Sequence, residues 1–94
     1  MNNKAKGKVL IENERARVTE WSFSKGSATG WHQHEYDYIV VPMLDGKLEL
    51  FSKTGNNTFS ELKKGIPYFR KAGIEHNVRN ANDFDYKFME IEIK

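Results

Sequence analysis

The residues most suited to chemistry in this chain are its histidines, of which there are only three. His32 and His34 stand two positions apart in the segment Gly-Trp-His-Gln-His, and His76 follows 42 positions after His34. Imidazole is a common metal ligand near neutral pH. Side chains two residues apart on a β-strand project to the same side, so the pair could share one ion with a histidine from another strand. The spacing therefore predicts a metal site made by His32, His34 and His76.

The composition limits the possible metal ligands and the possible classes of protein. The chain has no cysteine, which excludes disulfides and any Cys-ligated metal and leaves histidine and carboxylate as ligands. Its 94 residues, 38% hydrophobic and 30% charged, suit one globular domain. The net charge of +2 comes from intermixed acids and bases, so we expect neither nucleic acid nor a membrane surface as a partner. No apolar stretch long enough for a signal peptide follows the basic start, so we expect a cytoplasmic protein.

The elements that position the histidines are expected to be β-strands, because no helical pattern of any length is present. Short runs of β-branched and aromatic residues alternate with turn residues such as Asp45-Gly46, which indicates an all-β sandwich or barrel. Strands are expected over residues 9–12, 15–23, 31–41, 47–53, 58–62, 66–69, 74–79 and 84–93. Eight or nine short strands suit a jelly roll, in which pairing two sheets protects the strand edges.

The alternation of side chains places the histidines among apolar residues. On the segment 74–79, His76 shares a face with Ile74 and Val78. On the segment 31–41, one face carries His32, His34, Tyr36, Tyr38 and Val40. Such faces are expected to line the interior of the barrel. A concave apolar pocket with a few convergent polar groups is typical of a site for a small molecule.

The same residues resemble the two sequence motifs of the cupin family. The first motif, G-x5-H-x-H-x(3,4)-E-x6-G, is matched by Gly26, His32, His34 and Gly46. The second motif, G-x5-P-x-G-x2-H-x3-N, is matched by Gly65, Gly73, His76 and Asn80, with Lys71 in place of the proline. The resemblance covers residues 26–80. It implies an all-β, single-domain cupin jelly-roll barrel of two antiparallel sheets over residues 8–94, with residues 1–7 as a flexible N-terminus. The motif glycines are expected in turns that require positive φ.

The chain departs from the first motif at its glutamate, which in cupins is usually a fourth metal ligand. Tyr38 and Ile39 occupy the two positions where it could fall. Tyr38 shares the histidine face and could turn its hydroxyl inward, whereas Asp37 would need a β-bulge to reach the ion. Glu90 in the last strand is another carboxylate donor. The sequence leaves open whether Tyr38, Asp37, Glu90 or water completes the coordination.

Three neutral imidazoles leave open positions on a divalent ion. Some cupins hold iron with such a set, among them cysteine dioxygenase and a diketone-cleaving dioxygenase. By this resemblance we expect iron, with zinc, nickel, copper, cobalt or manganese as alternatives. The implied function is a metal-dependent enzyme of dioxygenase or isomerase type on a small organic substrate. A non-catalytic module that binds or senses a small molecule is the alternative. The histidines could also be ordinary core residues of a cupin that has lost its metal.

Two tyrosines are candidate catalytic residues because they share the histidine face. Tyr36 or Tyr38 could act as general acid or base if a nearby cation lowered its pKa, and both could equally be core aromatics. Arg15 and Arg17 could meet an anionic ligand at the pocket mouth or simply be solvated. Small cupins are commonly dimers, and aromatic strands leave apolar surface to bury, so we expect a homodimer.

Overall fold

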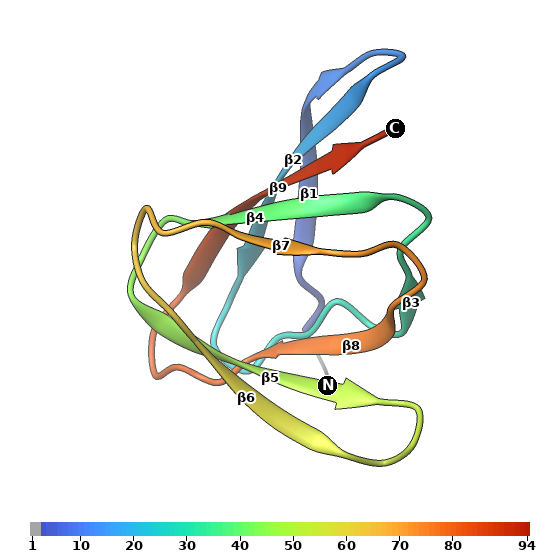
Figure 1. The fold of residues 1–94 in the computed structure, drawn as a ribbon. Coiled ribbons are helices and arrows are strands. Elements are labelled where there is room, and N and C mark those ends of the chain that lie inside the picture. Colours follow the sequence, from blue (N-terminus) through green and yellow to red (C-terminus); the bar gives the residue numbers. More distant parts are fainter. Residues whose placement is uncertain (1–2) are drawn as a thin grey trace.

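The computed structural model describes residues 3–94, and these residues form nine β-strands without any helix (Figure 1). The strands are β1 (Lys6–Glu12), β2 (Ala16–Phe23), β3 (His32–Gln33), β4 (Asp37–Pro42), β5 (Gly46–Ser52), β6 (Asn57–Leu62), β7 (Tyr68–Arg70), β8 (Glu75–Asn80) and β9 (Tyr86–Ile93). The expected all-β class is confirmed. Residues 1 and 2 of the expected flexible segment 1–7 lie outside the described residues, and β1 begins at Lys6. Within residues 3–94, the fold offers no helix of the length and apolar character that crossing a membrane would require.

The strands form two antiparallel sheets that enclose the interior of a barrel. The five-stranded sheet has the order β1-β2-β9-β4-β7, and the four-stranded sheet has the order β3-β8-β5-β6. In Figure 1, β4 and β7 lie on one side of the interior, and β8, β5 and β6 lie on the other. Strands far apart in the chain pair directly, as β2 does with β9 from Ala16–Ile93 to Phe23–Tyr86. The fold is the jelly roll expected from the sequence.

The hydrophobic core fills one end of the barrel and continues into the walls of the cavity beside the histidines. Phe23 pairs with Tyr86 across β2 and β9, and each is 1% exposed. On the opposite sheet Leu48 pairs with Asn80 at the end of β8, whereas His76 lies near the start of that strand. The buried hydrophobic residues are Phe23, Tyr38, Val40, Leu48, Leu62, Val78, Tyr86 and Phe88. The packing of these residues fixes the strands that carry the histidines and the cavity beside them.

The structure corrects the expected strand over residues 31–41. The segment divides into β3, which belongs to the four-stranded sheet, and β4, which belongs to the five-stranded sheet. Residues 34–36 form the bend at which the chain crosses from one sheet to the other. Alternation along a single strand therefore does not continue from His34 to Tyr38. The prediction was wrong because closing a barrel of two sheets requires a corner, and the local sequence carries no strong turn signal there.

The structure also corrects the expectation of positive φ at Gly46. Gly26, Gly65 and Gly73 have positive φ, of 72°, 75° and 95°, but Gly46 does not. A Cβ atom at Gly46 would lie 2.5 Å from Cε1 of the Tyr86 ring. The hydroxyl of this tyrosine donates a hydrogen bond to the carbonyl oxygen of Leu44 at 2.7 Å. Gly46 is therefore required by the close approach of a buried ring, not by backbone conformation.

The fully buried side chain of Asn80 stabilises the turn between β8 and β9 through hydrogen bonds. Its Nδ2 donates hydrogen bonds to the carbonyl oxygens of Phe84 at 2.9 Å and Ser24 at 3.1 Å. Its Oδ1 accepts a hydrogen bond from the backbone N–H of Asn82 at 2.9 Å. A buried amide with these partners is satisfied, so Asn80 has a structural role.

Candidate metal centre and its cavity

Strand pairing brings the three histidines together. His32 on β3 is the direct cross-strand partner of His76 on β8. His34 lies just beyond β3, where its backbone N–H donates to the carbonyl oxygen of Ile74 at 2.9 Å. Its own carbonyl oxygen accepts a hydrogen bond from the N–H of Gly73 at 2.8 Å. These backbone contacts hold the H-x-H segment beside β8, so the three side chains meet although they come from separate parts of the chain.

The three imidazoles converge through their Nε2 atoms. The Nε2 atoms of His32 and His34 are 3.1 Å apart, and those of His34 and His76 are also 3.1 Å apart. One ligand atom from each of the three residues lies within 4.8 Å of those of the others. Two nitrogens about 2.1 Å from one divalent ion, and about 90° apart, would stand about 3.0 Å from each other. The spacing of the Nε2 atoms therefore fits three ligands on one face of a divalent ion.

A hydrogen bond on the far side of one ring fixes its tautomer. Nδ1 of His32 lies 2.9 Å from the carbonyl oxygen of Gly30. A carbonyl oxygen can only accept, so Nδ1 donates and the lone pair is on Nε2, toward the other histidines. The hydroxyl of Thr29 donates to the same carbonyl oxygen at 2.9 Å and accepts from the N–H of Val78 at 3.2 Å. Outer contacts of this kind orient metal-binding imidazoles.

Burial keeps two of the rings neutral at physiological pH. Burial lowers the pKa of His34 to about 4, and the charge of neighbouring His32 acts in the same direction. Burial also lowers the pKa of His76 to about 4, with further contributions from His32, His34 and Arg70. Neutral imidazoles that point their lone pairs at one place suit a cation, and nitrogen donors suit a transition metal. The donor set therefore fits a divalent transition-metal ion.

Tyr38 occupies the interior beside this cluster, at one of the positions where the motif glutamate could fall. Its ring stacks on that of His34, with centroids 3.9 Å apart and an angle of 19° between the planes. Burial is the main cause that raises the pKa of Tyr38, and the charge of Glu90 adds to it. The lowered pKa on which a role as general base depends is therefore not present. A protonated Tyr38 hydroxyl can donate a hydrogen bond, and its catalytic role stays a prediction.

Neither the candidate Asp37 nor Ile39, at the other position of the motif glutamate, contributes to the cluster. Oδ1 of Asp37 accepts a hydrogen bond from the N–H of Ala72 at 2.8 Å, which uses this carboxylate to hold the segment that follows β7. Ile39 alternates with the inward-facing Tyr38 and Val40, so it lies on the outer face of the five-stranded sheet. The bulge that Asp37 would need is absent from the described pairing of β4 with β9.

Glu90 faces inward from the middle of β9 and is 8% exposed. Burial raises the pKa of Glu90 to about 7, and the nearby Glu92 carboxylate adds to this effect. The indole of Trp21 and the guanidinium of Arg17 act in the opposite direction. Among the described residues, the group of ligand atoms within 4.8 Å of one another consists of the three histidines and includes no carboxylate. Glu90 is therefore a neighbour of the histidine cluster and not a member of it.

A cavity of about 140 Å³, called the inner cavity, adjoins the histidines inside the barrel. It is lined by Trp21, Thr29, His32, His34, Tyr38, Val40, Leu48, Leu50, Tyr68, Arg70, Ile74, His76, Val78, Phe88 and Glu90. A water molecule takes about 30 Å³ in the liquid, so this volume corresponds to about five waters. The inner cavity is therefore suited to a compact ligand that reaches the Nε2 atoms.

A second cavity of about 250 Å³, called the outer cavity, adjoins the first. Both are lined by Trp21, Thr29, His32, His34 and Glu90. The outer cavity is also lined by Arg17, Gln33, Glu35, Tyr36 and Glu92. Tyr36 thus lines the outer cavity but not the inner one, and the centre of its ring is 6.0 Å from the Arg17 guanidinium carbon. Its expected catalytic role stays a prediction, from a position at the approach to the histidines.

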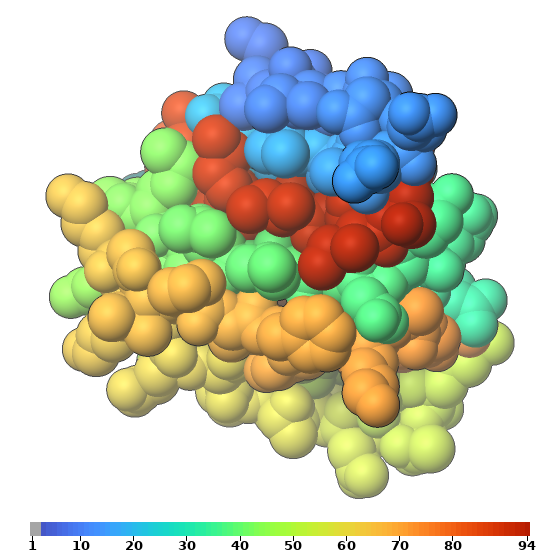
Figure 2. All heavy atoms as spheres, turned by 45° about the horizontal axis from the view of Figure 1, so that its top comes forward, coloured from blue at the N-terminus to red at the C-terminus, as the bar shows by residue number. Residues whose placement is uncertain are grey.

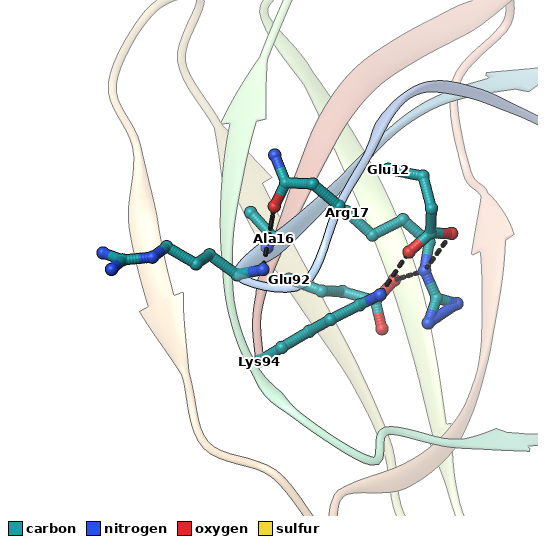
Figure 3. A network of polar contacts seen from close by, with 7 residues as sticks. Glu12, Ala16, Arg17, Glu92 and Lys94 are labelled. Carbon is teal, nitrogen blue, oxygen red and sulfur yellow. Dashed lines mark hydrogen bonds and ion pairs between the residues drawn. The ribbon is translucent and has the colours of Figure 1, made fainter.

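Arg17 is held by an ion-pair network at the rim of the outer cavity (Figure 3). Its Nε lies 3.3 Å from Oε1 of Glu12 and 3.5 Å from Oε1 of Glu92. Lys94 contacts the same Glu12 carboxylate. Arg15 is exposed, and its backbone N–H donates to Oδ1 of Asn13 at 2.8 Å. Because two carboxylates already neutralise Arg17, this side chain is poorly placed to bind an anionic ligand.

Sequence reasoning missed three residues of the inner cavity: Trp21, Thr29 and Arg70. Trp21 and Arg70 lie on β2 and β7, and Thr29 lies in the loop before β3. Alternation along the strands offered a signal, because it groups Trp21 with Arg17 and Arg70 with Tyr68. It could not show which of the two faces points inward. That choice depends on how the sheets pack.

The jelly roll and the converging histidines define the class of protein, and comparisons with known proteins agree. The chain belongs to the cupin family. It is 48% identical to a cupin domain from Bordetella pertussis, whose crystal structure it matches with a TM-score of 0.96 over 100% of this chain and 97% of that one. It is also 48% identical over 86 residues to the "Beta-alanine degradation protein BauB" of Pseudomonas aeruginosa, covering 92% of this chain and 90% of that protein.

More distant structures share the fold alone. A cupin 2 conserved barrel domain protein from Salinispora arenicola has a TM-score of 0.73 and 20% sequence identity, over 99% of this chain and 78% of that one. No family model matches the sequence.

Proposed function

We propose that His32, His34 and His76 bind one divalent metal ion and that the chain is a metal-dependent enzyme acting on a compact organic substrate. The observation that carries the proposal is the convergence of three Nε2 atoms beside the inner cavity. Iron is the expected metal, with zinc, nickel, copper, cobalt or manganese as alternatives. A divalent ion with three imidazole ligands supplies open coordination positions at which a small molecule can bind and be polarised.

The size and lining of the inner cavity support a small substrate. A volume of about 140 Å³ accommodates a molecule of a few non-hydrogen atoms. Apolar side chains such as Val40 and Phe88 limit the water around the histidines, which strengthens electrostatic interactions there. The name of the Pseudomonas aeruginosa relative, a β-alanine degradation protein, favours a compact compound as substrate.

A non-catalytic module that binds a small molecule is the second candidate. The observation that favours it is the loss of the motif glutamate, with Tyr38 stacked on His34 and Ile39 facing outward. The two candidates share the inner cavity and differ in whether the bound molecule changes. The distinction therefore rests on turnover by metal-loaded protein.

Metal content tests the proposal directly. The chain is produced with each candidate metal supplied in turn, and bound metal is measured in the wild type, His34→Gln and the control Gln33→Ala. Gln33 lies between the two histidines but is exposed, so its replacement leaves the ligands in place. We expect near-stoichiometric metal in the wild type and control, and little in His34→Gln. Wild-type protein without metal under every condition would overturn the proposal. Oxygen uptake or product formation with compact substrates then separates an enzyme from a binding module.

We also propose that two copies associate through the outer face of the five-stranded sheet. A row of apolar side chains crosses this face in register, with one residue from each strand in sheet order: Ile11, Val18, Ile91, Ile39 and Phe69. The end residues Ile11 and Phe69 are 51% and 48% exposed. Figure 2 looks onto this face, where blue, red, green and orange segments follow one another in that order.

This apolar row is complementary to itself, which favours a second copy as its partner. Ile91 lies in the middle of the row, because β9 is the central strand. A two-fold axis that lies between the two faces, parallel to β9 and passing over Ile91, would lay the row of one copy over that of the other in reversed order, apolar against apolar. Met89 and its cross-strand partner Val41 extend the apolar surface. Sedimentation that shows only monomer at micromolar concentration would contradict this proposal.

A further inference from the structure

The inner cavity carries one charge of each sign besides its histidines. Within the part of the chain that the structure describes, Glu90 is the acidic side chain of the lining and Arg70 is the basic one. The other lining groups are aliphatic, aromatic or hydroxyl-bearing. A cavity with one anion and one cation on otherwise apolar walls is complementary to a molecule with one group of each charge.

Glu90 lacks the counter-charge that a buried carboxyl normally has. Its side chain lies on the inward face of β9 together with Phe88 and Glu92, and no ion pair joins it to a basic residue anywhere in residues 3–94. Arg17, a nearby cation, is already held by Glu12 and Glu92. A buried carboxylate without a cation is costly, and a ligand that brings a positive group would relieve that cost.

The indole of Trp21 adds a second polar group beside Glu90. Its Nε1 is buried and makes no hydrogen bond of ordinary geometry among the described residues, but its N–H interacts with the Glu90 carboxyl. It lies near enough to Glu90 to lower the pKa of that carboxyl, and it lines both cavities. A buried N–H beside an acid favours the ionised form of the acid. At Glu90 burial outweighs this effect and raises the pKa of the carboxyl, and a ligand cation would act in the direction of the indole. A ligand that brings a positive group to Glu90 and Trp21 would therefore stabilise the ionised carboxylate.

Arg70 is the basic residue of the lining, and it lies across β4 from Glu90. Tyr38 pairs with Arg70 on β7, and Val40 pairs with Glu90 on β9. The two charged residues are thus two strands apart and offset by two positions, which places their Cα atoms about 12 Å apart at ordinary sheet spacings. Both side chains line the inner cavity from the same sheet. Arg70 is exposed, with its guanidinium 4.4 Å from the centre of the Tyr68 ring, and its Nη1 donates a hydrogen bond to the carbonyl oxygen of Phe69 at 3.0 Å. The charged group therefore lies at the solvent-facing side of the inner cavity.

We propose that the inner cavity selects a compact zwitterion, with a primary amine bound by Glu90 and a carboxylate bound by Arg70 beside the histidines. This inference rests on the proposed function for the role of the metal, but the two charged contacts are properties of the cavity itself. The substrate class is therefore a short amino acid whose amine and carboxylate lie at opposite ends.

Three probes with the same carbon skeleton test the inference: β-alanine, propionate, which lacks the amine, and propylamine, which lacks the carboxylate. Their binding to metal-loaded protein is measured by titration calorimetry and repeated after removal of the metal. We expect β-alanine to bind the wild type roughly tenfold or more tightly than either other probe. In Glu90→Gln, β-alanine should bind no more tightly than propionate. In Arg70→Gln, β-alanine should bind no more tightly than propylamine. The matched controls Glu61→Gln and Arg15→Gln, at exposed positions, should keep the wild-type order.

The outcomes separate this inference from the proposed function. Propionate that binds as tightly as β-alanine, an advantage that survives in Glu90→Gln, or no binding of β-alanine would each overturn the zwitterion site. Metal bound by the histidines without selective binding of β-alanine would leave the metal proposal standing alone. Selective binding that depends on Glu90 and Arg70, in a chain that never takes up metal, would uphold the zwitterion site and refute the metal proposal.

Discussion

Replacing Glu90 by glutamine should make the metal-free protein more stable, and increasingly so as the pH rises. Burial raises the pKa of Glu90 from 4.5 to about 7 in the folded protein. A carboxyl whose folded-state pKa is raised stabilises the fold most below its unfolded pKa, and this contribution is lost as the pH rises from about 4.5 to about 7. Glutamine has nearly the same shape and does not titrate, so Glu90→Gln should avoid the loss.

The size of the change in unfolding free energy follows from the shift in the pKa of Glu90. Each pKa unit corresponds to about 1.4 kcal/mol, so the full penalty on the wild type is about 3 kcal/mol. About a quarter of this penalty is already present at pH 5, and nearly all of it is present at pH 8. The stability gained by Glu90→Gln should therefore grow by roughly 2–3 kcal/mol between pH 5 and pH 8.

Urea unfolding of chelator-treated protein at the two pH values measures this difference. Protein concentration is held constant, because association of two copies would contribute to stability. The titration of the histidines is common to both variants and cancels in the comparison. Glu61→Gln, at an exposed position on β6, is the control and should show no such growth. Unfolding free energies of wild type and Glu90→Gln that stay parallel from pH 5 to pH 8 would show that the carboxyl is solvated or paired, and would refute the reasoning.

Three further perturbations have defined outcomes. Because the pKa values of His34 and His76 are lowered to about 4, metal-free protein should be fully stabilised by these groups above pH 6.5 and should lose that stability as the pH falls toward 4, as acid titration followed by fluorescence would show. Ile91→Lys should shift the chain toward monomer in sedimentation without loss of the fold, since it places a charge at the centre of the apolar row. Gly46→Ala should lower the melting temperature by several degrees, since its Cβ would meet the Tyr86 ring, and an unchanged melting temperature would show that the ring can move aside.

Local patterns were sufficient to predict the fold and the histidine cluster. Turn residues separated short β-rich runs, which predicted the jelly roll. The H-x-H spacing placed His32 and His34 on one side of their segment because side chains alternate along an extended chain. His76 was linked to them by the resemblance to the second cupin motif, and the structure pairs it directly with His32.

The residues around the histidines depended on contacts that no local pattern contains. Tyr36 and Tyr38 have the same parity, yet the chain changes sheets before β4, so Tyr38 enters the inner cavity and Tyr36 lines the outer one. Gly46 looked like an ordinary turn glycine, but the buried ring of Tyr86, forty positions later, explains it.

The sequence by itself thus determined the class of fold and predicted that His32, His34 and His76 come together, from turn residues, the alternation of side chains and the resemblance to the two cupin motifs. Only the tertiary structure decided that Glu90 and Arg70 face the same small cavity, one from β9 and the other from β7, with β4 between them. Which side of a strand faces inward, and which distant side chain it meets there, depends on how the two sheets pack. The charges that would select a ligand are therefore a property of the closed barrel.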